Sequence, residues 1–360
     1  MSGLKQLKLQ LGTIQTTMKI TSAMKMISVS NLRKSHALLL DTYPYLDEIT
    51  RMLRRLVRSV SYRQEQLIKQ GSNEVIQLPA LLKGHDEVKK HFVVCVTSDE
   101  GLCGRFNASV INKTQRVIDY LENQMNHQVT AVCFGSRGGD LLKRKYPDLP
   151  MHIIGQKANK NSELFQEAEK VALTLMDMFY RELFDECTVV YSEFESAAVQ
   201  HIKVEQIIPL QTFQHEDKWE FLNQSEDPDY VKRDVLGQKK LRSANALFFT
   251  AIGGQNIKSP LGSVDADALL KESTRLPDAY DYESSDLKIL DYTLPLFVEE
   301  HVYKVLLNTM ASESASRMIA MESASKNATD MVKKINKKYH RKRQELVTKD
   351  LTEVVAGSVN

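Results

Sequence analysis

The stretch FVVCVTSDEGLCGRFN, residues 92–107, predicts how the middle of this chain folds. Residues 92–97 form a short apolar run rich in β-branched side chains, which is typical of a buried strand. Gly101 and Gly104 follow, and two glycines so close together indicate a tight turn with backbone angles that other residues rarely adopt. A helical pattern continues over residues 106–126. The stretch therefore predicts a strand, a turn and a helix.

The same alternation recurs along the next hundred residues. Three more apolar runs predict strands at residues 129–134, 151–154 and 188–191. Helical patterns at residues 138–145 and 162–184 separate them, and an extended or strand segment is expected at 199–210. Alternating strands and helices are typical of a parallel sheet covered by helices. We therefore expect a Rossmann-like α/β domain with a mainly parallel sheet over residues 88–212.

Both ends of the chain predict long helices. Apolar residues near the start recur at spacings of three and four, the pattern of a coiled-coil seam, at Leu4, Leu7, Leu11, Ile14 and Met18. The same spacing continues one stripe over at Ile20, Met24, Ile27 and Asn31. Pro44 is expected to kink or briefly interrupt this helix.

The last segment has the same spacing and many small side chains at 311–328, which allow helices to approach closely. We expect residues 1–60 and 288–360 to pack as an antiparallel coiled coil. Residues 61–87 are then a connecting helix or linker, and residues 213–287 an acidic, irregular insert.

The net charge of +2 hides an uneven distribution of charged residues. Balance over the whole chain argues against a dedicated nucleic-acid binder. Residues 1–40 and 331–344 nevertheless carry basic residues and no acid, whereas residues 213–287 have an acidic excess. A solvated coiled-coil face usually carries glutamate as well, so the two basic ends favour an acidic partner surface.

The cysteines and the hydropathy pattern exclude other classes of protein. The chain has four cysteines, which are Cys95, Cys103, Cys133 and Cys187. They are too few and too scattered for a disulfide framework and show no metal-ligand spacing, which fits a reducing compartment. No run of about eighteen apolar residues is present, so no transmembrane segment is expected.

Each candidate catalytic motif has a plainer interpretation. The segment GSRGG, residues 135–139, resembles a phosphate loop but matches neither the dinucleotide nor the P-loop pattern, which favours a plain βα turn. Ser98, Asp99 and Cys103 at a strand end suggest a nucleophile, but no histidine partner is evident. The histidines are interpreted as surface residues: His85, His91, His301 and His340. No catalytic residue, cofactor or metal is therefore expected.

Five segments, in order, resemble the gamma subunit of F-type ATP synthases. Their positions are 24–34 (MKMISVSNLRK), 97–107, 134–138, 313–328 and 339–357. Each motif is short, but five in the right order on elements of the predicted type are specific. Glu100 and Arg105 depart from the family pattern, and the insert is longer than is usual there.

The resemblance implies a mechanical function. The terminal helices would be the central rotor shaft inside the ring of alpha and beta subunits, and the α/β domain a foot on the epsilon subunit and the membrane c-ring. The chain would have no catalytic site of its own. It would be peripheral on an energy-transducing membrane, on the cytoplasmic side in a bacterium or the matrix side in a mitochondrion. The alternative is a nucleotide-binding Rossmann-like enzyme with helical oligomerisation arms, for which no nucleotide fingerprint is present.

The resemblance also assigns residues to contacts. The positions that would contact the beta subunit are Met24, Lys25, Arg343, Gln344 and Thr348. The apolar tip that would turn in a hydrophobic bearing consists of Val347, Leu351, Val354 and Val355. The turn motif of the foot consists of Asp99, Gly101, Gly104 and Asn107. The insert is expected on the outside of the foot.

Overall fold

The computed structural model describes residues 2–70, 76–85, 87–154, 161–210, 219 and 286–357. Most of the insert expected at 213–287 therefore lies outside the described residues. The chain divides into two compact units. The helical unit contains Met1–Arg33, Leu102–Gly104 and Ser314–Asn360, and the α/β unit contains Lys34–Gly101 and Arg105–Glu313.

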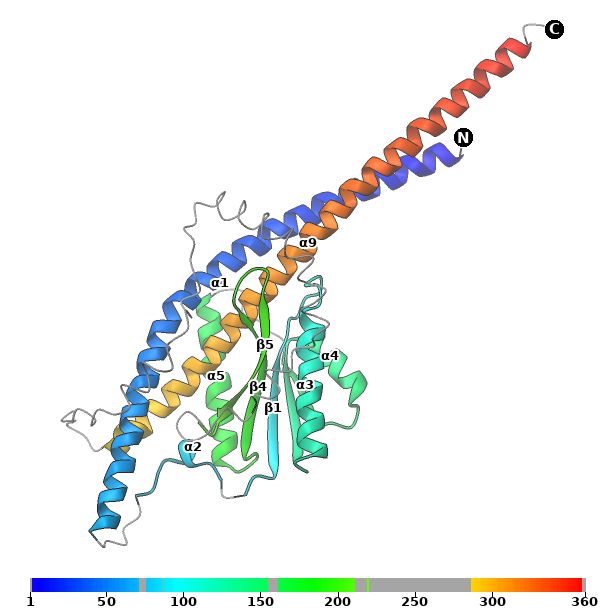
Figure 1. Cartoon of the computed structure of the whole chain (residues 1–360). Helices are drawn as coiled ribbons and strands as arrows, with labels where there is room; N and C mark the ends of the chain where they lie inside the picture. The colour runs from blue at the N-terminus through cyan, green and yellow to red at the C-terminus, as the bar shows by residue number, and fades with distance from the viewer. Residues whose placement is uncertain are drawn as a thin grey trace. The chain divides into compact units, whose positions relative to one another are not determined.

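A five-stranded sheet organises the described part of the α/β unit, with strand order β3-β2-β1-β4-β5 (Figure 1). The strands are β1 (Lys90–Val96), β2 (Gln128–Phe134), β3 (Met151–Ile154), β4 (Glu186–Phe194) and β5 (Gln200–Ile208). All neighbouring pairs are parallel except β4 with β5, which is antiparallel. The mainly parallel sheet expected from the sequence is confirmed.

Helices cover this sheet because its central strands are apolar on both faces. The short helices and those between strands are α2 (Ala80–Lys83), α3 (Phe106–Asn123), α4 (Ser136–Lys145) and α5 (Asn161–Tyr180). Helix α3 contacts β1, β2 and β4, and α4 contacts β2 and β3. Helix α5 contacts the C-terminal part of the α/β unit, where Phe165 meets Tyr303 with ring centroids 5.2 Å apart.

The core of the α/β unit contains one residue that the sequence pattern did not place there. Val93, Val117 and Ile118 are fully buried in a cluster that also includes Trp219. The Trp219 ring lies 5.9 Å from Tyr120 and 6.1 Å from His91. The expectation that the insert lies outside the foot is therefore wrong for this residue. Transfer of its large apolar ring from water into the core lowers the free energy of the folded chain.

The terminal helices are α1 (Ser2–Lys69) and α9 (Asp286–Gly357). Pro44 lies inside α1 without interrupting it, so of the expected kink or interruption the interruption is wrong. Pro44 is exposed, so water can replace the hydrogen bond that proline removes, and buried Leu39 and Leu46 hold the helix on either side.

Within the helical unit the seam of α1 differs from the expected one. The first stripe, from Leu4 to Met18, is its less exposed side, as expected. The seam then continues through buried Thr21 and Ser28, while Ile20 and Ile27 are 54% and 60% exposed. Thr21 and Ser28 are small, and Met321 and Ala328 of α9 are buried as well, so small side chains in this seam allow the two helices to approach closely.

The sheet register brings two cysteines together. Cys95 of β1 lies opposite Cys133 of β2, and the structure joins them in a disulfide. Cys103 and Cys187 are free and buried. The sequence pattern does not reveal this pair, because 38 residues separate its members and only the strand pairing makes them neighbours.

Candidate functional site

The polar side chains of the turn motif bond to groups of neighbouring loops and helices within the chain. The Asp99 carboxylate accepts hydrogen bonds from the backbone N–H and the hydroxyl of Ser136, at 2.7 and 2.8 Å. Ser136 is the first residue of α4, so the carboxylate stabilises the positive end of that helix. Asn107 Oδ1 accepts the backbone N–H of Ser98 at 2.9 Å. Both side chains hold the loops at the carboxyl ends of the strands.

The two glycines of the motif differ in backbone conformation. Gly104 has a φ of +62°, as its residue type suggests. Gly101 does not adopt a positive φ; Leu102 does, at 66°, so the expectation of special angles is wrong for Gly101. The geometry of a turn determines which residue must have a positive φ. Here that residue is Leu102, which is not a glycine, so its backbone is strained.

The segment 135–139 is a tight βα turn. Gly135 has a φ of +98°, and a Cβ there would fall on the carbonyl of Thr97. A Cβ on Gly138 would collide with the Thr97 side chain, whose hydroxyl donates to the carbonyl of Phe134 at 2.9 Å. Close backbone packing therefore accounts for these glycines. Since the Asp99 carboxylate already occupies the start of α4, a phosphate would meet like charge there.

Three histidines interpreted as surface residues are built into the α/β unit. The His301 side chain is only 17% exposed and its Nε2 lies 3.1 Å from Glu205 Oε2, so the surface interpretation is wrong for it. His91 is 1% exposed, and its Nε2 lies 2.8 Å from the Thr188 hydroxyl, so the surface interpretation is wrong. His85 is partly buried, stacks on Phe179 at 4.5 Å, and places Nδ1 3.1 Å from Asp185 Oδ1. The imidazole ring is partly apolar, so a histidine can be buried once its ring nitrogens have polar partners. A lone histidine in a sequence does not show whether such partners exist.

The candidate beta-contact residues fall into two groups that the structure does not bring together. Met24 and Lys25 are partly exposed on α1, and Lys25 Nζ lies 3.2 Å from Glu322 of α9. Arg343, Gln344 and Thr348 are exposed on α9. At the rise of an α-helix, Arg343 lies about 30 Å along α9 from Glu322. Any partner that contacts both groups must therefore reach along the helical unit.

The apolar tip of α9 is exposed in the chain alone. Val347, Leu351 and Val354 are 49%, 60% and 70% exposed. Val355 lies in the last turn of the same helix. Three exposed aliphatic side chains near one helix end are typical of a surface that a partner covers.

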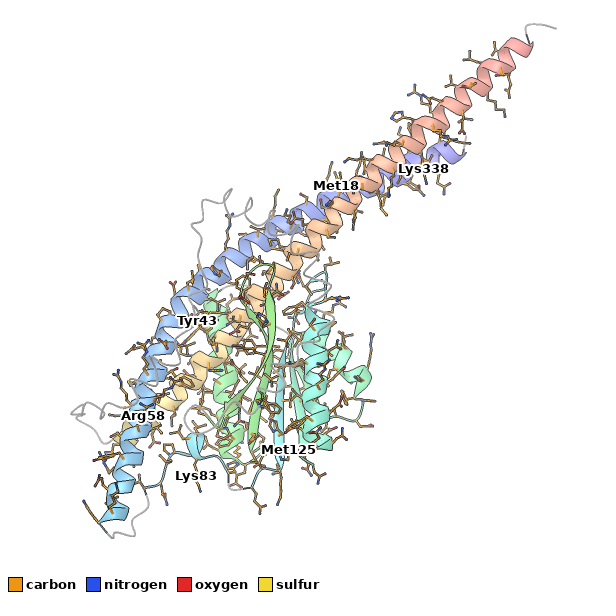
Figure 2. The ribbon with its side chains drawn as sticks, viewed as in Figure 1. Met18, Tyr43, Arg58, Lys83, Met125 and Lys338 are labelled. Atoms are coloured by element: carbon orange, nitrogen blue, oxygen red, sulfur yellow. A yellow bond between two sulfur atoms is a disulfide. The ribbon has the colours of Figure 1, made fainter. Side chains whose placement is uncertain are left out.

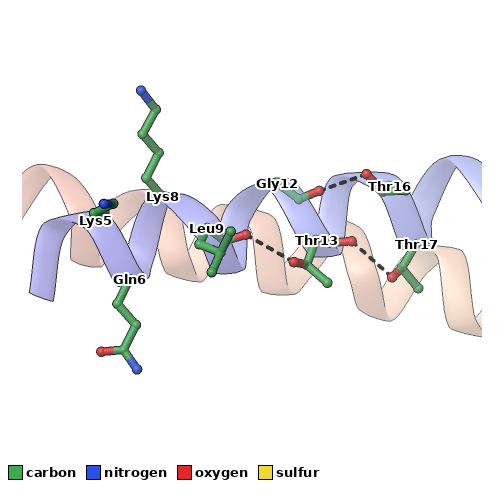
Figure 3. A pocket seen from close by; sticks show the side chains of 8 residues that line it. All are labelled: Lys5, Gln6, Lys8, Leu9, Gly12, Thr13, Thr16 and Thr17. Atoms are coloured by element: carbon green, nitrogen blue, oxygen red, sulfur yellow. Dashed lines mark hydrogen bonds between the residues drawn. The ribbon is translucent and has the colours of Figure 1, made fainter. Parts of the chain in front are cut away.

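An open depression of about 890 Å³ follows the start of α1 (Figure 3). It is lined by Lys5, Gln6, Lys8, Leu9, Gly12, Thr13, Thr16 and Thr17. The three threonine hydroxyls donate to carbonyls of their own helix at 3.0–3.2 Å. Lys8 and Gln6 point to opposite sides of the helix in Figure 3, so no polar groups converge on a small ligand.

Neither a metal centre nor a membrane span is found in the part of the chain that the structure describes. No three of its His, Cys, Asp or Glu side chains gather closely enough to hold an ion. None of its helices is both long and apolar enough to cross a membrane.

Comparisons with known proteins give one consistent family. The family model described as ATP synthase matches residues 3–359. The ATP synthase gamma chain of Rhodospirillum rubrum is 32% identical over 361 residues, 99% of each chain. That of Pelagibacter ubique is 29% identical, again over 99% of each chain.

Two solved structures support the fold at low sequence identity. The rotor of the Euglena gracilis mitochondrial ATP synthase in rotational state 1 has a TM-score of 0.51 at 16% identity, covering 96% of this chain and 99% of that one. A chain of the OSCP/F1/c-ring structure in rotational state 3 has a TM-score of 0.52 at 16% identity, covering 99% and 94%. With the full-length match to gamma chains, the conclusion is that this chain belongs to the ATP synthase gamma-chain family.

Proposed function

We propose that this chain is the central rotor shaft of an F-type ATP synthase. The main support for this proposal is the match to a gamma chain over 99% of both sequences, which leaves no large part of either sequence unmatched. The chain couples rotation of the membrane c-ring to conformational change in the catalytic beta subunits. The enzyme alternative has no support, since the start of α4 is occupied by Asp99 rather than open to a nucleotide.

The shaft acts without a catalytic site of its own. A rotor changes the affinity of a beta subunit for nucleotides only through contacts that differ between beta conformations. The helical unit supplies such contacts from its exposed side chains. Arg343 forms bidentate bonds to beta carboxylates, while Gln344 and Thr348 form neutral bonds that release readily.

Lys25 has a second role within the chain. Its ammonium already lies 3.2 Å from Glu322, so it ties α1 to α9. An ammonium carries three donors, and those not used by Glu322 remain for a beta carboxylate. Met24 beside it offers a soft apolar contact.

The apolar tip turns in a hydrophobic bearing formed by the alpha and beta subunits. Non-directional contacts suit rotation, because they do not favour one angle over another. Val347, Leu351, Val354 and Val355 provide this surface at the end of α9. Its exposure in the chain alone supports a partner that covers it.

The α/β unit is the foot, in contact with the epsilon subunit and the c-ring. The chain is thereby held peripherally on an energy-transducing membrane, on the side where ATP is made. Within the insert, Trp219 is buried in the core of the foot and so serves as an anchor point.

The test uses the assembled synthase in sealed vesicles. Arg343→Ala with Gln344→Ala is expected to lower the ions pumped per ATP hydrolysed by about fivefold or more. The matched control is Arg51→Ala, which removes an exposed arginine of α1 in the α/β unit, paired with Asp47 at 2.6 Å. Unchanged coupling in the double variant would contradict the beta contact. Nucleotide turnover by the purified chain alone would contradict the rotor function itself.

A further inference from the structure

A stripe of polar side chains on α9 faces the sheet of the α/β unit. The stripe consists of His301, Lys304, Asn308 and Ser312, whose spacings of three and four place them on one face of the helix. A helix that covers a sheet usually presents apolar side chains there. We call these four residues and their partners the polar seam.

Asn308 joins three elements of the α/β unit. It is fully buried, and its Oδ1 accepts the Tyr43 hydroxyl of α1 at 3.2 Å and the Phe194 backbone N–H of β4 at 3.1 Å. Its Nδ2 donates to the Lys304 carbonyl at 2.9 Å. Figure 2 labels Tyr43 on α1. One amide therefore fixes α1, β4 and α9 to each other.

Glu205 of β5 is the charged centre of the seam. Its carboxylate lies 3.1 Å from His301 Nε2 and 3.5 Å from Lys304 Nζ. Lys203 approaches the other carboxylate oxygen at 3.9 Å and also pairs with Glu193 at 2.8 Å. Only 22% of the Glu205 side chain is exposed, so solvent screens these attractions less than on an open surface.

The electrostatics agree with a strongly held carboxylate. Burial opposes ionisation of Glu205, but Lys304, His301 and Lys203 outweigh it and hold the pKa of Glu205 far below its usual range. At the far end of the seam, the Ser312 hydroxyl donates to the Ser192 carbonyl at 3.1 Å. Directional bonds therefore run along the seam from Glu205 to Ser312.

Directional bonds do something that apolar contacts do not. Apolar surfaces that slide or rotate by a few ångströms exchange one set of contacts for another of similar energy. A hydrogen bond or ion pair is lost by the same displacement, and its buried partners are left unsatisfied. A polar interface thus holds one register against a force.

We propose that the polar seam is the lock that transmits torque between the sheet of the α/β unit and helix α9. This inference rests on the rotor function proposed above. As the c-ring turns the foot, the β4–β5 hairpin exerts a force on α9 through two contacts, from Glu205 to His301 and Lys304 and from Phe194 to Asn308. These contacts prevent the helix from sliding along the sheet. A seam that only stabilised the fold would have no such dependence on load.

The test measures coupling under load in the assembled synthase. Glu205→Gln with Asn308→Leu removes the charge and the three-way amide while keeping side-chain size. The matched control is Asp177→Asn on α5 of the same unit, which breaks an exposed ion pair with Arg181 just after that helix. Ions pumped per ATP hydrolysed are measured in vesicles at increasing opposing ion-motive force.

At low load the double variant is expected to pump nearly as the wild type does. At high load its pumping per ATP is expected to fall about twofold or more, while the control does not change. Coupling equal to wild type at the highest load would overturn the proposal, as would a loss independent of load. If the double variant does not assemble, Lys304→Met is subject to the same two criteria. Failure of the wild-type chain to support any pumping would instead reject the rotor function.

Discussion

The helical unit and the α/β unit bury different kinds of side chain. The α/β unit encloses large apolar residues such as Leu53, Val93 and Phe179, each at 0% exposure. The helical unit leaves Leu9 73% and Met26 70% exposed, and apart from Met318 and Met321 it buries mostly small residues. The core of the α/β unit is therefore built from large apolar side chains, whereas the helical unit packs mainly through small ones.

Their polar groups differ in the same way. In the first turns of α1, threonine hydroxyls bond to carbonyls of the same helix. In the α/β unit, Asp185 and Asn308 bond to elements about a hundred residues or more away. Changes in the α/β unit should therefore alter folding, and changes in the helical unit should alter the working complex.

The largest expected effect is the loss of the Trp219 ring. Trp219→Ala leaves a cavity in the core and is expected to lower the free energy of unfolding of the full chain by about 3–5 kcal/mol. Urea unfolding followed by circular dichroism measures the change, with Trp219→Phe as a smaller-volume control. As the chain has one tryptophan, wild-type emission should also be typical of a buried indole. Emission typical of a solvated indole would contradict the anchor.

A pair of glycines tests the comparison directly. Gly135→Ala places a Cβ on the Thr97 carbonyl at a positive φ, and is expected to cost about 3 kcal/mol or more. Gly12→Ala in α1 meets no atom within 4 Å and is expected to stabilise the isolated chain by about 1 kcal/mol. Thermal unfolding of both variants decides the sign, and equal effects would remove the distinction between the units.

Asp185 predicts a pH dependence of the α/β unit. Its Oδ2 accepts the backbone N–H groups of Lys89 and Lys90, at 2.8 Å each. Burial opposes ionisation, but these bonds and His85 outweigh it and lower the pKa of Asp185. Since the folded pKa is depressed, the stabilisation is complete above the unfolded pKa of about 3.9 and is lost as pH falls through the folded pKa.

Asp185→Asn is therefore expected to cost about 1–3 kcal/mol at pH 7 and less as pH falls below about 4. Urea unfolding from pH 7 to pH 3 measures it. The control is Asp47→Asn, whose exposed pair with Arg51 is expected to contribute about 0.5 kcal/mol or less. A penalty for Asp185→Asn that stayed constant with pH would show that the ionised carboxylate is not the source.

The smallest effect is expected at the exposed end of α9. Arg343→Ala with Gln344→Ala should change the free energy of unfolding of the isolated chain by less than about 0.5 kcal/mol, because both side chains are exposed. The same variant is expected to weaken coupling in the complex. A large loss of stability in the isolated chain would mean that these side chains support the fold rather than a partner.

Much of the fold follows from local sequence periodicity. Apolar runs of four to six residues place the strands, and spacings of three and four place α1 and α9, because these patterns report which side of a strand or helix avoids water. Pro44 shows the limit of a local rule, since neighbouring buried leucines keep α1 intact. Gly101 shows another, because the positive φ falls on Leu102 next to it.

The candidate site was only partly accessible to such reasoning. Motif resemblance predicted a contact surface at the exposed end of α9, which stays a prediction, and placed Asp99 and Asn107 in a turn, where the structure has them. It missed Asn308 and Glu205, which carry no motif and look like ordinary residues of a helix and an edge strand. The only signal for these two residues in the sequence was a set of polar residues at helical spacing on α9 and an acidic residue on β5. The sequence does not show that the two come into contact.

The sequence by itself determined the alternation of strands and helices, the two long terminal helices and the basic character of their ends. These depend on neighbours within a few residues, where backbone geometry sets the period. Only the tertiary structure decided which stripe of α1 is buried, that Cys95 meets Cys133, that Trp219 enters the core and that a polar seam holds α9. Each of these depends on residues far apart in the chain, whose packing shape and hydrogen-bond partners exist only once the sheet and helices have come together.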